Sequence, residues 1–392
     1  MKTAVHMGGF VSVAAMLLLA LAVSCTQVDF VGDPVDTFEG SEDLEKIRMS
    51  KVGFDIDLPE DLAESNDPLY VTVAMNRIQN AGAHYVYDLD RNGELVNAPV
   101  DTSGRDPLQI HNGYYSVAAF VASEQEEYVI EDIEAFKDSL AYSMKELYVT
   151  MPELTKDEKI NLGYIDFNPI YPYVRNAGPS WYGRPTAESL ALITSDSETS
   201  NIIRIEPMML TRRFEFSVKI QIEEGVTVSR CVGTISGVPQ KVHLMTGVVS
   251  DSHTGKIGFE MDRISDTEYF GYVNAFGLFG SDNPDLIVGP GILSITVYAS
   301  AESNGRTRKR IFNASLNLKK EIEDLFVMRL AKDMTGYIFN EADRPVYSIA
   351  ADRGHVITKD MVITGITSGY EQWQVHDDDS DKDVNPGLNP EI

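Results

Sequence analysis

The residue types that most often catalyse reactions or bind metal ions are present in this chain, but their spacing forms no known constellation. Seven histidines occur, and none has a second histidine three or four positions away. The chain lacks the H-E-x-x-H pattern, a pair of nearby cysteines and the G-x-S-x-G turn that exposes a nucleophilic serine. Residues 233–237 (G-T-I-S-G) have the wrong spacing for that turn. The sequence therefore predicts a protein that is not an enzyme and that needs no metal ion or other cofactor.

The densest group of carboxylates lies near the C-terminus, where acids at alternate positions could coordinate a hard cation such as Ca²⁺. It begins at Asp377 and reaches Asp383. Lys382 occupies the place at which a calcium-binding loop needs glycine for its sharp turn, and no glutamate follows at the twelfth position. We therefore interpret residues 377–392 as a solvated acidic tail.

Cys25 is the side chain whose surroundings predict a covalent reaction. The apolar run at residues 10–23 precedes it and has the length of a signal-peptide core, too short to span a membrane comfortably. Small residues then lead into the cysteine in the order Ala22-Val23-Ser24-Cys25. This pattern resembles the lipobox of bacterial lipoproteins, in which the thiol is acylated and becomes the new N-terminus. We expect a lipoprotein signal peptide at residues 1–24 and a lipid on Cys25, the alternative being an ordinary signal peptide cut near Ala22.

The chain is strongly acidic, with a formal net charge of −27 at pH 7. Such a surface repels phosphate backbones, so the sequence excludes nucleic acid as a partner. Residues 25–48 are rich in acids and poor in large apolar side chains, and we interpret them as an acidic tether that holds the body off the membrane. Cys231 is the only other cysteine, and its strand-like surroundings predict a buried, unreactive thiol.

Aromatic residues gather in a proline-rich connector at residues 163–187. They are Tyr164, Phe167, Tyr171, Tyr173, Trp181 and Tyr182. Flat rings on a loop could stack on sugar faces, so the candidate glycan-binding residues are Tyr171, Tyr173, Trp181 and Tyr182. The alternative is that these rings cover the interface between two domains. The sequence leaves both interpretations open.

Residues 306–310 (R-T-R-K-R) are the one dense basic run in this acidic chain. The run follows Asn304-Gly305, a pair that favours a tight turn, so we expect it to line one arm of a hairpin. It is explained either as a charged edge strand that opposes aggregation or as a site where a partner docks or a protease cuts.

Alternation of apolar and polar residues predicts many short strands. The clearest example is residues 214–222, in which every second residue is apolar. Turn signals recur every 8–12 residues or so, which is typical of β-sandwiches. Short helices are expected near residues 131–142 and 318–330. The proline-rich connector and the polar residues 195–200 indicate a boundary, so we expect an N-terminal β-sandwich at 49–200 and a C-terminal one at 201–376.

Several segments resemble the fimbrillin-type lipoproteins of Bacteroidales, and within them the fimbrial anchor and minor-subunit branch. The resemblance spans most of residues 25–376 and rests on the lipobox cysteine, on residues 113–120, 205–216 and 233–239, and on a closing strand with Trp373. It implies an all-β fold of two tandem transthyretin-like β-sandwich domains. Shaft subunits of that family lose an N-terminal strand after cleavage at an arginine, and Arg48 occupies a corresponding place. Anchor members keep their lipid instead.

These patterns together predict a lipid-anchored fimbrial anchor or minor subunit, or adhesin, at the outer membrane and cell surface. The expected partners are the membrane, through the N-terminal lipid, and other fimbrial subunits, through sheet edges that pair with a donated strand. The rival hypothesis is a surface glycan-binding lipoprotein, whose ligand is a host molecule or another glycan held by Trp181 and its neighbouring tyrosines.

Overall fold

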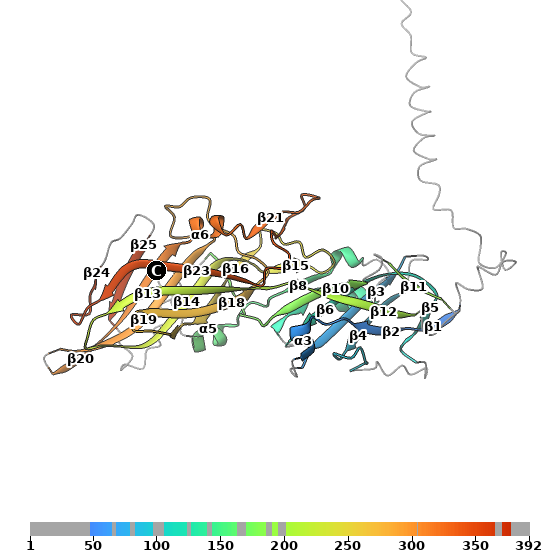
Figure 1. Cartoon of the computed structure of the whole chain (residues 1–392), viewed down its shortest axis with the longest axis horizontal. Coiled ribbons are helices and arrows are strands. Elements are labelled where there is room, and N and C mark those ends of the chain that lie inside the picture. The colour runs from blue at the N-terminus through green and yellow to red at the C-terminus, as the bar shows by residue number, and fades with distance from the viewer. Residues whose placement is uncertain are drawn as a thin grey trace, which may run out of the picture.

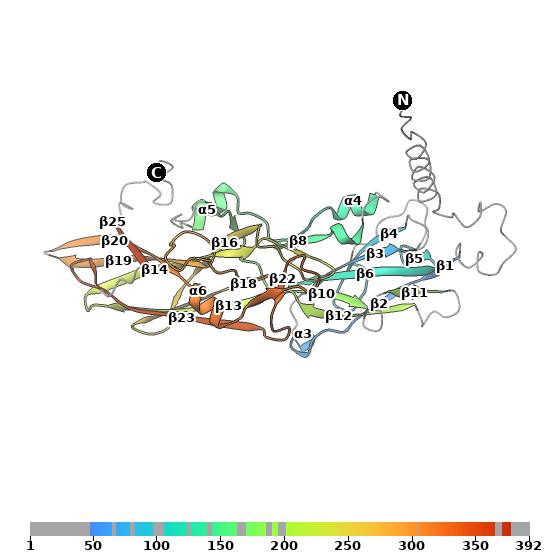
Figure 2. The ribbon, with the colours of Figure 1, turned by 90° about the horizontal axis from the view of Figure 1, so that it is seen from above.

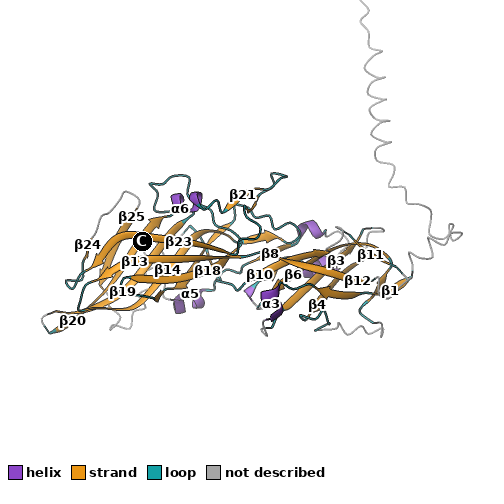
Figure 3. Ribbon diagram, in the orientation of Figure 1, coloured by secondary structure: helices purple, strands orange, loops and turns teal. Residues whose placement is uncertain are grey.

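The chain forms an elongated molecule in which most strands run along the long axis (Figure 1). The computed structural model describes residues 48–64, 68–78, 83–96, 106–123, 127–138, 143–162, 170–185, 190–194, 201–303, 305–364 and 371–377. One group of sheets lies at each end, as the view from above also shows (Figure 2). Strands dominate the described residues and the helices are short (Figure 3), which confirms the prediction of an all-β fold.

The N-terminal half is built on one seven-stranded sheet, on the right of Figure 1. Its strand order is β2 (Gly53–Ile56), β12 (Ile202–Met209), β10 (Ser180–Pro185), β6 (Gly113–Ala122), β3 (Tyr70–Arg77) and β4 (His84–Leu89), with β11 (Ala191–Ile193) as a further partner of β6. β2 and β12 are parallel, and the other pairs are antiparallel. At the outer end, β1 (Met49–Lys51) and β5 (Gln109–His111) pair with each other.

The seven-stranded sheet curls until its two outermost strands meet. Phe54 of β2 and Tyr87 of β4 have ring centroids 5.3 Å apart, although these strands stand at opposite ends of the strand order. The turn after β4 packs closely on β2. Gly93 in this turn has a φ of 79°, and a Cβ there would overlap the Phe54 carbonyl oxygen. Glycine alone adopts this conformation without strain and without that overlap. The curled sheet thus encloses its own buried core.

The C-terminal half consists of two facing sheets, on the left of Figure 1. The five-stranded sheet has the order β17 (Asp262–Arg263), β18 (Glu268–Ala275), β13 (Arg212–Ile222), β23 (Val346–Ile357) and β24 (Ile363–Thr364). The six-stranded sheet has the order β25 (Glu371–Asp377), β20 (Arg306–Asn317), β19 (Ile292–Ser303), β14 (Val226–Pro239), β16 (Thr254–Glu260) and β9 (Tyr173–Val174).

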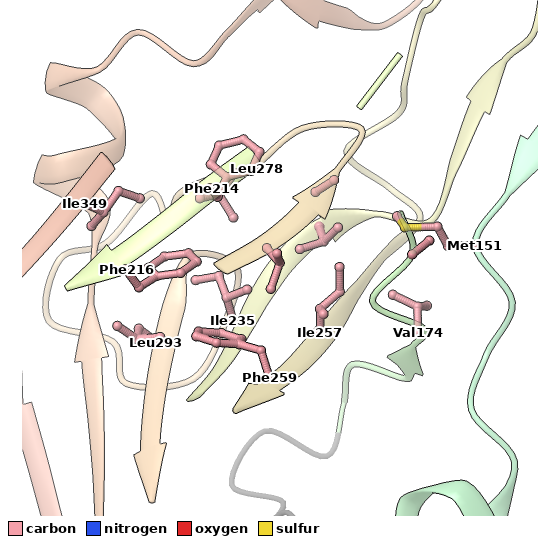
Figure 4. Close-up of a cluster of buried hydrophobic side chains, with 14 of the residues drawn as sticks. Met151, Val174, Phe214, Phe216, Ile235, Ile257, Phe259, Leu278, Leu293 and Ile349 are labelled. Carbon is pink, nitrogen blue, oxygen red and sulfur yellow. The ribbon is translucent and has the colours of Figure 1, made fainter. Parts of the chain in front are cut away.

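Alternate burial along the strands explains why these two sheets pack face to face. In β13 the apolar residues at positions 214, 216, 218 and 220 are buried, and the residues between them are partly or fully exposed. The Phe216 ring lies 5.3 Å from the ring of Phe259, which belongs to the opposite sheet. Figure 4 shows such side chains from both sheets meeting in one cluster. Each fully buried side chain of this size contributes roughly 1.5–3 kcal/mol, and the strand expected at 214–222 is confirmed.

Smaller elements fill the space between and around the sheets. A three-stranded sheet lies between the halves, with β15 (Lys241–His243), β8 (Tyr148–Thr150) and β7 (Val129–Ile130), and a hairpin joins β21 (Met328–Leu330) to β22 (Tyr337–Phe339). The helical elements are α3 (Glu60–Glu64), α4 (Ile133–Asp138), η2 (Met144–Glu146), α5 (Lys156–Leu162) and α6 (Lys319–Asp324). The two expected helices are therefore present as α4 and α6, each shorter than its predicted range.

The strand pairing departs from the expected division at residue 200. β12 begins after that residue and yet belongs to the N-terminal sheet, where it pairs with β2 and β10. β9 precedes residue 200 and yet pairs with β16 in the C-terminal sandwich. The buried cluster of the sandwich also continues into the N-terminal half through Ala74 and Phe120. The reason is physical, because alternation identifies a strand but contains no information about its distant partner.

Candidate docking edges

Two predicted site residues lie at or before the start of the described chain. Cys25 lies outside the described residues. Arg48 is the first described residue, and its carbonyl oxygen accepts a hydrogen bond from the backbone N–H of Asn112 at 2.9 Å. A cut after Arg48 would leave β1 and β2 attached to the body, so it would remove no strand from the described sheets. It would instead separate the body from Cys25.

The structure does not favour the alternative of a glycan platform around Trp181, because the ring of this residue is turned inward. Residues 180–185 form a strand, and Trp181 is 6% exposed in the core of the N-terminal sheet. Tyr173 is 5% exposed, and its ring centroid lies 4.3 Å from Nζ of Lys256. A ring that stacks on a sugar needs an open face, which neither residue has. Tyr171 is half-buried, and Tyr164 and Phe167 lie outside the described residues.

Tyr182 follows Trp181 on β10 and therefore points to the opposite face of the sheet. It is half-buried, packs against the core of the C-terminal half, and has its pKa raised by burial. Gly247, between β15 and β16, lies so close that a Cβ there would be 3.4 Å from the ring. Tyr182 thus fills space at the junction of the two halves, which agrees with the alternative interpretation of the connector.

β23 has an open edge along its first half. On one side it pairs with β13 along its length, whereas on the other side only Val356 and Ile357 pair with β24. Arg213 of β13 donates its N–H to the Pro345 carbonyl at 3.0 Å, which fixes the parallel register. In that register the backbone groups of Val346, Ser348 and Ala350 point away from β13. Of these outward groups, only the Val346 carbonyl has a partner among the described residues. It accepts a hydrogen bond from Nε of Arg344 at 3.1 Å.

The side chains at this edge leave it accessible to an incoming strand. Tyr347, Ile349 and Ala351 are buried in the sandwich, whereas Ser348 and Ala350 are exposed and small. Sheet edges are commonly protected by lysine, by proline or by charges that point inward. Residues 346–351 (V-Y-S-I-A-A) contain none of these. The edge is therefore suited to pairing with a strand from outside this chain.

The edge of β18, by contrast, is capped by a side chain. Asn176 donates from Nδ2 to the Tyr272 carbonyl at 3.3 Å, and its Oδ1 accepts a hydrogen bond from the backbone N–H of Asn274 at 3.2 Å. Asn274 donates from Nδ2 to the Ala177 carbonyl at 3.0 Å. The two asparagines thereby make hydrogen bonds that a further strand would otherwise make. Because this edge is occupied, whereas on β23 the outward groups of Ser348 and Ala350 have no partner among the described residues, β23 is the better docking edge.

A polar hollow of about 370 Å³ lies next to the capped edge. β16 and β18 supply most of its lining, which includes Glu260, Asp262 and Tyr272, together with Asn176 from the connector. Tyr272 is 44% exposed, and its ring centroid lies 3.8 Å from the guanidinium carbon of Arg213. An exposed ring beside carboxylates and an amide is a combination that can hold a sugar by stacking and by hydrogen bonds to its hydroxyls.

Comparison with known proteins gives a likeness in structure alone. No family model matches the chain, and no curated protein matches it. A candidate adhesin from Bacteroides ovatus is similar with a TM-score of 0.45 and 14% identity, over 79% of this chain and 94% of that one. The fimbrial anchor protein from Porphyromonas gingivalis is similar with a TM-score of 0.38 and 11% identity, over 84% and 98%.

A candidate polysaccharide-binding protein from Bacteroides thetaiotaomicron is also similar, with a TM-score of 0.37 and 12% identity, over 85% of this chain and 99% of that one. Within the described part of the chain, no helix has the length and apolar character needed to cross a membrane.

Proposed function

We propose that this protein is a lipid-anchored, non-enzymatic fimbrial anchor or minor subunit, or adhesin, at the outer membrane and cell surface. In this proposal it joins a neighbouring subunit by strand pairing at a sheet edge. The observation that supports it most is the open edge of β23, where the backbone groups of Ser348 and Ala350 have no partner among the described residues. A donated strand would satisfy these groups and extend the five-stranded sheet.

The position of the tether suits an anchor. β1 follows the acidic tether directly and lies at one end of the molecule, whereas β23 belongs to the sandwich at the other end (Figure 1). A fully extended segment of the length of residues 25–48 spans at most about 86 Å. The net charge of −27 also repels anionic lipid headgroups. The lipid would thus hold the molecule while the body, with its open edge, extends away from the membrane.

In this proposal Arg48 stays uncut. It lies between Cys25 and the first strand, so cleavage there would release the whole described body from the lipid. The same cleavage would open no groove in the described sheets, because β2 would keep its pairing with β12. Cleavage would therefore abolish anchoring without creating an acceptor site, and the anchor form is the intact one.

The experiment that tests the proposal follows the lipid and the partners together. Cells that express the natural chain, Cys25→Ser or Cys231→Ser are grown with a fatty acid that carries an alkyne, and the protein is isolated for intact-mass analysis. We expect an acylated chain that begins at Cys25 in the natural protein and in Cys231→Ser, together with co-isolated fimbrial subunits. Cys25→Ser should lose the label. A natural protein that is full-length, unacylated and intracellular would contradict the proposal.

Glycan binding is a second candidate function, and the hollow beside Tyr272 is the observation that favours it. Because Trp181 is buried, the sugar would be held by Tyr272 with Asp262 and Asn176 rather than by the aromatic rings of the connector. A glycan array with the natural protein and Tyr272→Ala tests this, with Tyr171→Ala as the control from the earlier candidate set. Binding that is lost in Tyr272→Ala alone supports the second function, and binding unchanged in that variant excludes this hollow as its site.

A further inference from the structure

Four large apolar side chains are exposed at the outer end of the N-terminal sheet, where β1, β5 and β11 lie (Figure 1). Each belongs to a different segment and points outward, because an adjacent residue in the chain is buried on the inner face. We name them the apolar row: Ile78 (51% exposed), Tyr114 (39%), Leu192 (46%) and Ile202 (52%). Single exposed apolar residues are ordinary on protein surfaces, but a group of them in one place marks a surface that contacts something else.

Backbone pairing holds the members of the apolar row close together. Leu192 of β11 lies directly opposite Tyr114 of β6, so their Cβ atoms are about 5 Å apart. On the other side of Tyr114, its carbonyl oxygen accepts a hydrogen bond from the backbone N–H of Ile78 at 2.9 Å. The start of β12 is joined to the end of β11 by Asn201, whose side chain accepts from the Thr194 N–H at 3.0 Å and donates to the Thr194 carbonyl at 2.8 Å. The row is therefore one surface that crosses neighbouring strands.

The chain enters the fold beside the apolar row. Arg48 ends the acidic tether, and its carbonyl oxygen accepts the hydrogen bond from the backbone N–H of Asn112. Asn112 stands two residues before Tyr114, so the Cα atoms of these two residues are at most about 7 Å apart. A lipid on Cys25 would thus hold the molecule by the end that carries the row.

The chemistry of this end suits the interface between lipid and water. Tyrosine is enriched at that interface because its ring is apolar and its hydroxyl reaches water, and aliphatic side chains beside it can enter the apolar layer. Two ion pairs at this end balance their own charge: Nε of Arg204 lies 2.9 Å from the Asp55 carboxylate, and Nζ of Lys51 lies 3.2 Å from that of Asp106. These groups therefore add no net charge that would repel a zwitterionic lipid surface.

From this arrangement we infer that the apolar row contacts the surface of the membrane to which the lipid is attached, so that the body stands on this end. The inference rests on the lipid anchor of the proposed function. The tether keeps the row near the same bilayer, so even a weak contact is populated. The sandwich with β23 lies at the other end of the molecule (Figure 1). The expectation that the tether holds the body off the membrane then applies to the rest of the body and not to this end.

Tryptophan fluorescence measures the contact. Tyr114→Trp places an indole in the apolar row, and Tyr70→Trp is the matched control. Tyr70 is 36% exposed and begins β3, eight residues before Ile78, so it lies about 26 Å from the row along the strand. Each acylated full-length protein is reconstituted into phosphatidylcholine vesicles whose acyl chains do or do not carry bromine, which quenches nearby indoles. The natural protein, with its two tryptophans, supplies the background.

Bromine should lower the emission of the added indole about twofold in Tyr114→Trp and leave that in Tyr70→Trp unchanged. Adding Leu192→Asp to Tyr114→Trp places a carboxylate opposite the indole and should reduce the quenched population about tenfold. Leu330→Asp is the control for this change, because Leu330 is 53% exposed and lies on β21 in the other half. It should leave the quenching as it is.

Urea unfolding shows whether each variant is folded. If Leu192→Asp fails to fold, Ile78→Ser makes the same test from the other side of Tyr114. Quenching that survives either folded variant would overturn the inference. A dimer in solution that Leu192→Asp dissociates would assign the apolar row to a second copy of the chain and would overturn it as well.

Intact mass separates the failure of this inference from that of the proposed function. Equal quenching in Tyr114→Trp and Tyr70→Trp, or none in Tyr114→Trp, would overturn membrane contact in a chain whose Cys25 carries lipid, and the lipid anchor would stand. If Cys25 carries no lipid in cells, the proposed function fails, and a dialkyl maleimide attached to Cys25 of residues 25–392 replaces it, since buried Cys231 does not react. In that protein, quenching confined to Tyr114→Trp supports the contact, and its absence overturns it.

Discussion

Proline at position 348 should block the open edge of β23 and leave the sheet intact. The Ser348 N–H points away from β13, so Ser348→Pro removes no hydrogen bond of the ladder between these strands. Proline is tolerated at such outward positions of edge strands. The hydroxyl of Ser348 also donates to Glu215 at 3.2 Å, an exposed bond that contributes little to stability. We expect the free energy of unfolding to fall by about 1 kcal/mol or less.

The effect on docking should be much larger. A donated strand would bond to the outward groups of Ser348 and Ala350 and to the Val346 N–H, and each such bond contributes about 1 kcal/mol net. Proline removes the central donor, and its ring occupies the space that the incoming strand needs. The loss of about three bonds costs ~3 kcal/mol, which weakens binding about a hundredfold.

Binding of the full chain to the co-isolated fimbrial subunit, by biolayer interferometry, measures this loss, and urea unfolding measures stability. Ser348→Ala is the matched control, since it removes the hydroxyl but keeps the N–H, and it should bind like the natural protein. Ile349→Pro is the opposite control, because its N–H bonds to β13, and it should destabilise the fold by ~3 kcal/mol. Natural affinity in a well-folded Ser348→Pro variant would refute the reasoning.

Four further predictions follow from individual side chains. Gly93→Ala should lower the free energy of unfolding by ~1–3 kcal/mol in a urea titration, because its φ of 79° and its contact with β2 exclude a Cβ. Trp181→Ala should lower it by ~3–5 kcal/mol in the same assay, without any change in glycan binding. Burial raises the pKa of the Cys231 thiol, so thiol reagents at pH 8 should modify it only after unfolding, as intact mass would show. Hydrogen bonds from Thr155 and then Arg175 lower the pKa of Glu158 to about 2. The contribution of this carboxylate to stability is therefore complete above about pH 5 and is lost as the pH falls toward 2. NMR of the Glu158 carboxyl should show a titration midpoint near 2, and this midpoint should rise in Arg175→Gln.

The sequence predicts the local structure well where alternation is strong. The strand at 214–222 and its buried face follow directly from the spacing of Phe214, Phe216 and their successors. The connector is a different case, because its prolines suggest a loop, although Pro179 only precedes β10 and Pro185 is the last residue of that strand. That is why the sequence left open a surface position for Trp181, which lies in a core.

The docking edge could not be predicted from the sequence. Residues 346–350 are recognisable as a strand, but their openness depends on the parallel partner β13, more than a hundred residues earlier in the chain, and on the short length of β24. The division at residue 200 fails for the same reason, since β12 pairs with β2 from the start of the chain. Partner choice is a property of the whole fold, and short-range patterns do not contain it.

Photo-crosslinking at the open edge tests the central claim most directly. A photoreactive amino acid replaces Ala350, which is exposed at the edge, or Lys219, which is exposed on β13 but has a strand on each side. In cells that assemble fimbriae, light should join the protein to a fimbrial subunit from position 350 and not from position 219. Equal products from both positions, or none from position 350, would contradict assembly through this edge.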